Sequence, residues 1–189
     1  MHGADWSHDG RFIIYHQVTA DNGRDLWTLE VTPDGKLVPG ASPRPYNRAS
    51  FNQMWARFSP DDHWVAYQSD DSGRAEIYVQ AFPEPGQRIP ISAGGGTFPE
   101  WGAAGRELYY VSTSGKLMAV ELKYRGSSLE PSPPHELFPV SRAGAAGTPP
   151  YEAAPDGRRF LTFVAISSSQ PLNVIVNWPA LMMQRGASQ

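Results

Sequence analysis

Residues 58–67 read FSPDDHWVAY, a polar turn that leads into an apolar strand. The same order of residue types recurs in the stretches that begin at Trp6 (WSHDGRFIIY), Trp101 (WGAAGRELYY) and Ala153 (AAPDGRRFLT). Ser and Asp side chains bond readily to the backbone of such turns, and Gly accepts the positive φ that a tight reversal needs. Four repeats at intervals of 43 to 52 residues predict a run of propeller blades, each a sheet of about four strands.

Each repeat is predicted to continue as a hairpin. First strands are expected at 12–18, 64–69, 108–112 and 160–165, and second strands at 25–31, 76–82, 117–122 and 172–178. Short stretches flanked by Pro at 36–38, 88–92 and 136–140 are predicted as outermost strands, because a missing N–H matters least at a sheet edge. Inner strands are expected at 55–58 and 99–101, whereas the first repeat leaves little room for one.

The composition favours an all-β fold. In 189 residues, 18 Gly and 18 Pro interrupt the chain too often for long helices, and the 22 aromatic residues (six Trp, eight Tyr and eight Phe) supply bulk for packing between sheets. We predict one propeller domain, residues 1–189, with blades at approximately 5–50, 51–96, 97–148 and 149–180 and a tail at 181–189. Because blades with open edges invite pairing, we expect a partial ring or one completed by another chain, with a homodimer as one possibility.

Three large aromatic residues recur at one position of the repeat. Trp6, Phe58 and Trp101 each stand directly before the polar turn. We expect them to pack one blade against the next, with a ligand platform as the alternative, because large rings fill the space between sheets.

Charge and hydropathy argue against two kinds of partner, nucleic acid and the membrane interior. The formal net charge is −3 and the 16 Lys and Arg residues are scattered, so the sequence does not predict nucleic-acid binding. No apolar run is long enough to cross a bilayer, so no membrane segment is expected. The residues themselves leave the compartment open.

No residue is assigned to catalysis, to a cofactor or to a metal. The chain has no Cys, no Gly-x-Ser-x-Gly elbow and no His-Glu-x-x-His motif. The acidic pairs Asp61-Asp62 and Asp70-Asp71 lack the alternating spacing of a calcium loop and are interpreted as turn residues. A metal shared by His8 and His63 would need their two turns to meet. We therefore expect a protein that is not an enzyme.

Four polar residues occupy one equivalent position, just before the start of each turn. They are Asp5, Arg57, Glu100 and Glu152. Because side chains alternate along a strand, these four are expected to face one direction and to line the propeller axis as candidate binding residues. A solvated channel and a specific peptide- or ligand-binding ring both fit this pattern.

Longer motifs resemble a known family. FSPDDHWVAY, followed by SDDSGRAEIYVQAFP and GGGTFPEW, resembles the TolB-type propeller repeat. The likeness spans all four repeats and is strongest in residues 51–123. The third repeat departs from it at Ala103-Ala104-Gly105, where the family has Pro-Asp-Gly, and the first has His8 in place of Pro.

The stretches EIYVQAFP, GRELYYVSTSGKLMAVEL and VIVNW resemble the C-terminal propeller region of bacterial transmembrane serine/threonine protein kinases. This resemblance implies a sensor or docking part that lies outside the cytoplasmic membrane. No kinase motif is present in these residues.

The sequence thus favours a non-catalytic module that binds a protein or peptide, as the sensor or docking part of a larger bacterial signalling protein. Two alternatives stay open. The chain is an accessory propeller that gates substrate access to a hydrolase or peptidase, or it is a scaffold that completes a ring by self-association.

Overall fold

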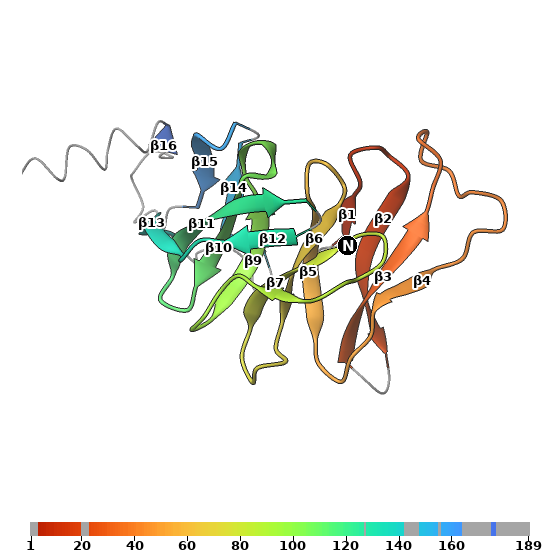
Figure 1. The fold of residues 1–189 in the computed structure, drawn as a ribbon, viewed down its shortest axis with the longest axis horizontal. Helices are drawn as coiled ribbons and strands as arrows, with labels where there is room; N and C mark the ends of the chain where they lie inside the picture. The colour runs from red at the N-terminus through yellow and green to blue at the C-terminus, as the bar shows by residue number, and fades with distance from the viewer. Residues whose placement is uncertain are drawn as a thin grey trace, which may run out of the picture.

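The computed structural model describes residues 4–19, 23–126, 128–141, 148–154, 156–163 and 175–176. It confirms the nearly all-β fold: four antiparallel sheets follow one another in chain order across the molecule (Figure 1). The first sheet stands at one end of this row and the last at the other. Within the described residues, no helix is long and apolar enough to span a membrane.

The sheets are built from consecutive strands. The first has the order β1 (Ala4–Trp6), β2 (Phe12–Thr19), β3 (Gly23–Glu30), β4 (Arg44–Asn47). The second has the order β5 (Gln53–Phe58), β6 (Trp64–Ser69), β7 (Glu76–Ala81), β8 (Ile89–Pro90). In the third, β9 (Gly96–Trp101), β10 (Glu107–Ser112) and β11 (Lys116–Arg125) are followed by β12 (Ser128–Pro131) and β13 (His135–Pro139), which both pair with β11. The fourth contains β14 (Tyr151–Ala153), β15 (Arg159–Thr162) and β16 (Ile175–Val176).

The polar turns between inner strand and hairpin are held by the Ser and Asp side chains that define the repeat. Ser59 Oγ donates to Asp61 Oδ1 at 2.5 Å and accepts from the backbone N–H of Trp64 at 3.0 Å. The fourth residue of each turn has a positive φ, at Gly10, Asp62, Gly105 and Gly157, and in the third turn Ala104 has one as well. The second repeat is therefore the one that places a side chain where the other three have Gly.

The third turn is built without the Ser side chain, and Ala104 has a positive φ in addition to Gly105. Gly102 stands at the position of Ser7 and Ser59, and Ala103–Gly105 form a short 3-10 turn. A Cβ atom on Gly102 would lie 2.7 to 2.9 Å from the ring and hydroxyl of Tyr109. The ring of Tyr109 thus fills the space that the Ser side chain takes in the first two turns.

Three apolar clusters lie between neighbouring sheets. The first joins Ile14, Leu26 and Tyr46 of the first sheet to Phe58, Val65, Tyr67 and Tyr78 of the second. The second joins Trp64, Ala66, Ile77, Val79 and Ile91 to Leu108, Tyr110, Val120, Leu122 and Leu129. The third joins Tyr109, Val111, Leu117, Ala119, Leu137 and Val140 to Tyr151 and Phe160. The core of the protein is therefore a series of contacts between sheets.

Two details of the predicted first blade are wrong. Its outermost strand is β4, not 36–38, where Leu37 makes only a single bridge to Val31. The strand lies later because Tyr46 is the residue that becomes buried, 5% exposed, and its hydroxyl donates to Ala81 O at 2.6 Å. The first repeat also has an inner strand, β1, which pairs with β2. The predicted strand at 172–178 lies largely outside the described residues.

Candidate binding site at the central opening

The four equivalent residues picked from the sequence line one cavity of about 580 Å³. Each comes from the inner strand of a different sheet: Asp5 from β1, Arg57 from β5, Glu100 from β9 and Glu152 from β14. Their strands bring together three carboxylates and one guanidinium. The alternation of side chains along the inner strands accounts for this convergence.

Asp5 links the first sheet to the second. Its Oδ2 accepts a hydrogen bond from the backbone N–H of Phe58 at 2.8 Å. Burial is the largest influence on this carboxyl and raises its pKa, while the Phe58 N–H and the charge of Arg57 act in the opposite direction. Asp5 therefore has a structural contact as well as a place in the cavity.

Glu100 makes the equivalent link from the third sheet to the fourth. Its Oε2 accepts from the backbone N–H of Ala153 at 2.8 Å. Burial raises the pKa of Glu100 to about 7, against the lowering effects of the Ala153 N–H and of Arg57, and the charges of Glu152 and Asp5 raise it further. Glu100 is therefore a carboxyl that titrates near neutral pH inside the cavity.

The link between the second and third sheets is different. Arg57 cannot accept a hydrogen bond from the next strand, and the indole Nε1 of Trp101 instead donates to the backbone oxygen of Arg57 at 3.0 Å. The guanidinium of Arg57 reaches back to the first sheet, where Nη1 donates to Ala4 O at 3.3 Å. The side chain at position 57 thus stays beside the acidic groups.

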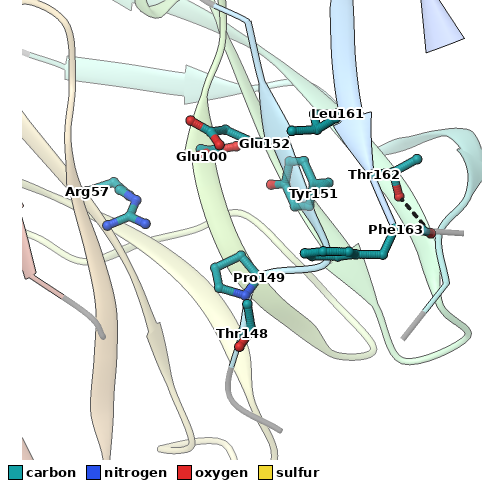
Figure 2. A pocket seen from close by; sticks show the side chains of 9 residues that line it. All are labelled: Arg57, Glu100, Thr148, Pro149, Tyr151, Glu152, Leu161, Thr162 and Phe163. Carbon is teal, nitrogen blue, oxygen red and sulfur yellow. Dashed lines mark hydrogen bonds between the residues drawn. The ribbon is translucent and has the colours of Figure 1, made fainter. Parts of the chain in front are cut away.

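A second cavity, of about 490 Å³, shares Arg57, Glu100 and Glu152 with the first. Figure 2 shows Arg57 across this space from the two glutamates. Its remaining wall is largely apolar and consists of residues in and next to the strands of the fourth sheet: Thr148, Pro149, Tyr151, Leu161, Thr162 and Phe163. The three charged residues therefore have open space on two sides.

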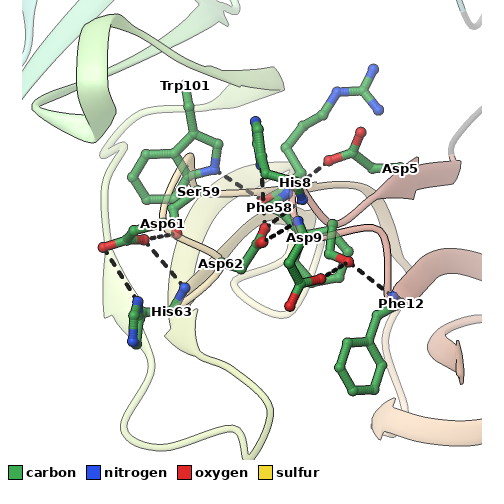
Figure 3. A network of polar contacts seen from close by, with 12 residues as sticks. Asp5, His8, Asp9, Phe12, Phe58, Ser59, Asp61, Asp62, His63 and Trp101 are labelled. Carbon is green, nitrogen blue, oxygen red and sulfur yellow. Dashed lines mark hydrogen bonds and ion pairs between the residues drawn. The ribbon is translucent and has the colours of Figure 1, made fainter. Parts of the chain in front are cut away.

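Asp62 joins the polar turn of the second repeat to that of the first (Figure 3). Its two carboxylate oxygens accept from the backbone N–H groups of His8 and Asp9, both at 2.8 Å. The ring of His8 also lies 3.2 Å from Asp62, whereas His63 lies 3.6 Å from Asp61. Within the described ranges no group of three or more His, Asp or Glu residues could hold a metal.

The recurring aromatic residues have different surroundings. Phe58 is buried between the first and second sheets, with the ring of Phe82 at a centroid distance of 4.9 Å. Trp101 packs against the cluster between the second and third sheets. Trp6 is 46% exposed, and its ring lies close to Gly35 in the connection between β3 and β4.

Inner strands of successive sheets that line one opening are the defining arrangement of a propeller. The fold is a β-propeller. TolB from Acinetobacter baumannii has a similar structure, with a TM-score of 0.59 and 15% identity over 84% of this chain and 36% of that one. This likeness supports a TolB-like propeller fold.

Two further solved structures are similar to this propeller. A periplasmic gluconolactonase from Pseudomonas aeruginosa matches with a TM-score of 0.54 and 19% identity, over 90% of this chain and 55% of that one. An oligogalacturonate lyase in complex with manganese matches with a TM-score of 0.56 and 14% identity, over 85% and 44%. The chain thus spans about a third to just over half of the length of these three proteins. No protein-family model and no curated protein matches the sequence.

Proposed function

We propose that this propeller is a non-catalytic binding module whose central opening receives a positively charged segment of a protein or peptide. The observation that carries the proposal is the convergence of Asp5, Glu100 and Glu152, with a single guanidinium, on a cavity of about 580 Å³. Carboxylates in a partly enclosed space favour a partner that supplies N–H donors and positive charge.

Glu152 is the carboxylate best placed to meet such a partner. Its side chain is exposed, and it forms no hydrogen bond or ion pair with any residue that the structure describes. Asp5 and Glu100 each use one oxygen for a backbone N–H of the next sheet, and both side chains also line the cavity. A Lys, an Arg or an amino terminus has the donors to engage these groups together.

We also propose a role for this module within a larger protein, and a cellular location. The sequence resemblance to kinase-associated propellers supports a docking or sensing part of a larger signalling protein. The same resemblance supports an extracytoplasmic location.

Binding can be tested with two fluorescein-labelled octapeptides, one of alternating Lys and Gly and one of alternating Glu and Gly, by fluorescence anisotropy. We expect the Lys peptide to bind and the Glu peptide not to bind. Glu152→Gln should weaken binding of the Lys peptide several-fold. Glu84→Gln is the control, because Glu84 is an exposed carboxylate in the β7–β8 connection and its loss changes the net charge equally.

Equal affinity for both peptides would refute the proposal. So would equal losses in Glu152→Gln and Glu84→Gln, since that result would show attraction to the overall charge and not to the opening.

A further inference from the structure

On its outer face, the first sheet has large apolar side chains at the same repeat positions that the second sheet uses to pack against its neighbour. In the second sheet Phe58, Val65, Tyr67 and Tyr78 contact the first sheet and are at most 8% exposed. By repeat position and strand register, the corresponding residues of the first sheet are Trp6, Ile13, Tyr15 and Trp27. We call these four residues the rear face.

The third sheet confirms that these positions form a packing surface. Its equivalent residues are Trp101, Leu108, Tyr110 and Met118, and all four belong to the cluster shared with the second sheet. In the first sheet, by contrast, Trp6 is 46% exposed and Ile13, Tyr15 and Trp27 are only half-buried. The rear face thus has the composition of an inter-sheet contact but not its burial.

The fourth sheet, at the other end of the row, also has exposed apolar side chains at positions that are buried between sheets in its neighbour. Tyr109 and Val111 of the third sheet pack toward the fourth and are 1% exposed. Their equivalents, Leu161 and Phe163, are 52% and 47% exposed and line the cavity of about 490 Å³. Figure 2 shows both side chains on the wall of that cavity. We call Leu161 and Phe163 the front face.

We propose that the front face of one chain docks on the rear face of a second copy, so that two chains close a ring of eight sheets. One chain carries both halves of the contact that its own sheets form three times, which makes a second copy a complementary occupant. The faces lie at opposite ends of the row of sheets (Figure 1). Two front-to-rear contacts related by a two-fold axis close the assembly, and eight blades lie within the usual range.

The internal contacts also predict which residues meet. Between the third and fourth sheets, the rings of Tyr109 and Phe160 pack edge to face with a centroid distance of 4.9 Å. Leu161 is the equivalent of Tyr109, and Ile13 is the equivalent of Phe160. Leu161 of one copy is therefore expected to contact Ile13 of the other.

The mass of the 189-residue chain in solution, from light scattering over a dilution series, tests the closed ring. A dimer of twice 20.8 kDa is expected. Trp6→Glu and Leu161→Glu should each be monomeric, because either change places a charge in both contacts. Val18→Glu is the control and should stay dimeric, since Val18 is 69% exposed and lies on the opposite face of β2 from Ile13 and Tyr15.

Mixing the two monomeric variants distinguishes the mode of association. The intact front of Trp6→Glu can meet the intact rear of Leu161→Glu, so a heterodimer should form. A wild-type chain that is monomeric at every concentration, or that forms open oligomers of increasing size, would overturn the proposal. So would a dimer that survives Leu161→Glu, because association would then not use the front face.

A second measurement does not depend on acidic variants. The chain has no Cys, so Ile13→Cys with Leu161→Cys introduces one defined pair. A short bis-maleimide should link two chains of this variant, and mass spectrometry should find position 13 joined to position 161. Links only between two copies of the same position would contradict front-to-rear docking.

Discussion

Glu100 of the third sheet accepts the backbone N–H of Ala153 in the fourth at 2.8 Å. Asp5 accepts the N–H of Phe58 at the same distance, with the same separation of 53 residues along the chain. One carboxylate position of the repeat thus both lines the opening and fastens one sheet to the next. Substitutions of Asp5 or Glu100 are therefore expected to affect stability and binding together.

The stability of the fold should depend on the protonation of Glu100. Because burial raises its pKa from 4.5 to about 7, the folded chain keeps a proton that the unfolded chain releases, and stability falls as pH rises through this window. The free energy of unfolding of the wild type, minus that of Glu100→Gln, should fall by up to about 3 kcal/mol between pH 4.5 and 7 and then level off. Urea unfolding at a series of pH values measures this difference. A difference that is constant with pH would contradict the raised pKa.

Asp5 should matter for stability mainly as an acceptor. Asp5→Ala leaves the N–H of Phe58 without its partner beside a buried aromatic ring, which costs about 1–3 kcal/mol. Asp5→Asn retains a side-chain oxygen and should cost less. Glu152→Ala is the control at the equivalent position and should change the free energy of unfolding by less than about 0.5 kcal/mol. Equal losses in Asp5→Ala and Asp5→Asn would show that the charge, not the hydrogen bond, is what stabilises the contact.

Asp62 combines a positive φ of 58° with two hydrogen bonds to the first turn. Of two substitutions at this position, Asp62→Ala should be the more destabilising, by about 1–3 kcal/mol, because it loses both hydrogen bonds and keeps the unfavourable backbone conformation. Asp62→Gly loses the bonds but suits the backbone and should cost less. Thermal unfolding of the three proteins gives this order. If Asp62→Gly proves the less stable variant, the backbone conformation does not contribute as described.

Gly102 should not tolerate the Ser that its equivalents in the first two repeats carry. A side chain there would overlap the ring of Tyr109, so Gly102→Ser should destabilise the fold by about 1–3 kcal/mol. Combining it with Tyr109→Leu should cost less than the sum of the two single changes. Urea unfolding of the four proteins in this cycle measures the coupling, and strictly additive costs would argue against the overlap.

The repeat predicted the sheets and hairpins because the turn chemistry and the alternation of apolar residues are local. It also picked the four residues of the opening, since strand alternation fixes their common direction. The outermost strand of the first sheet was placed wrongly, because nothing in the sequence distinguishes the Leu37 stretch from that around Tyr46. Tyr46 is selected by its contacts with the second sheet, at Ala81 and Phe82.

The contacts between sheets could not be predicted in the same way. That Asp5 and Glu100 bond to the next inner strand depends on how two sheets are placed, which no periodicity encodes. The bridge from Asp62 to the first turn is equally distant in sequence. The sequence did contain one indication of this bridge, because Asp62 stands where a turn of this type ordinarily has Gly.

The hydrogen bond from the Trp101 indole to the backbone oxygen of Arg57 has a consequence for how the protein can vary. Every amino acid has that backbone oxygen, so the link between the second and third sheets places no demand on the side chain at position 57. Positions 5 and 100 must keep an acceptor to hold their neighbours. Substitutions at position 57 can therefore change the charge and shape of the opening while the link between the second and third sheets is kept, at the cost of the hydrogen bond from Arg57 to Ala4 O.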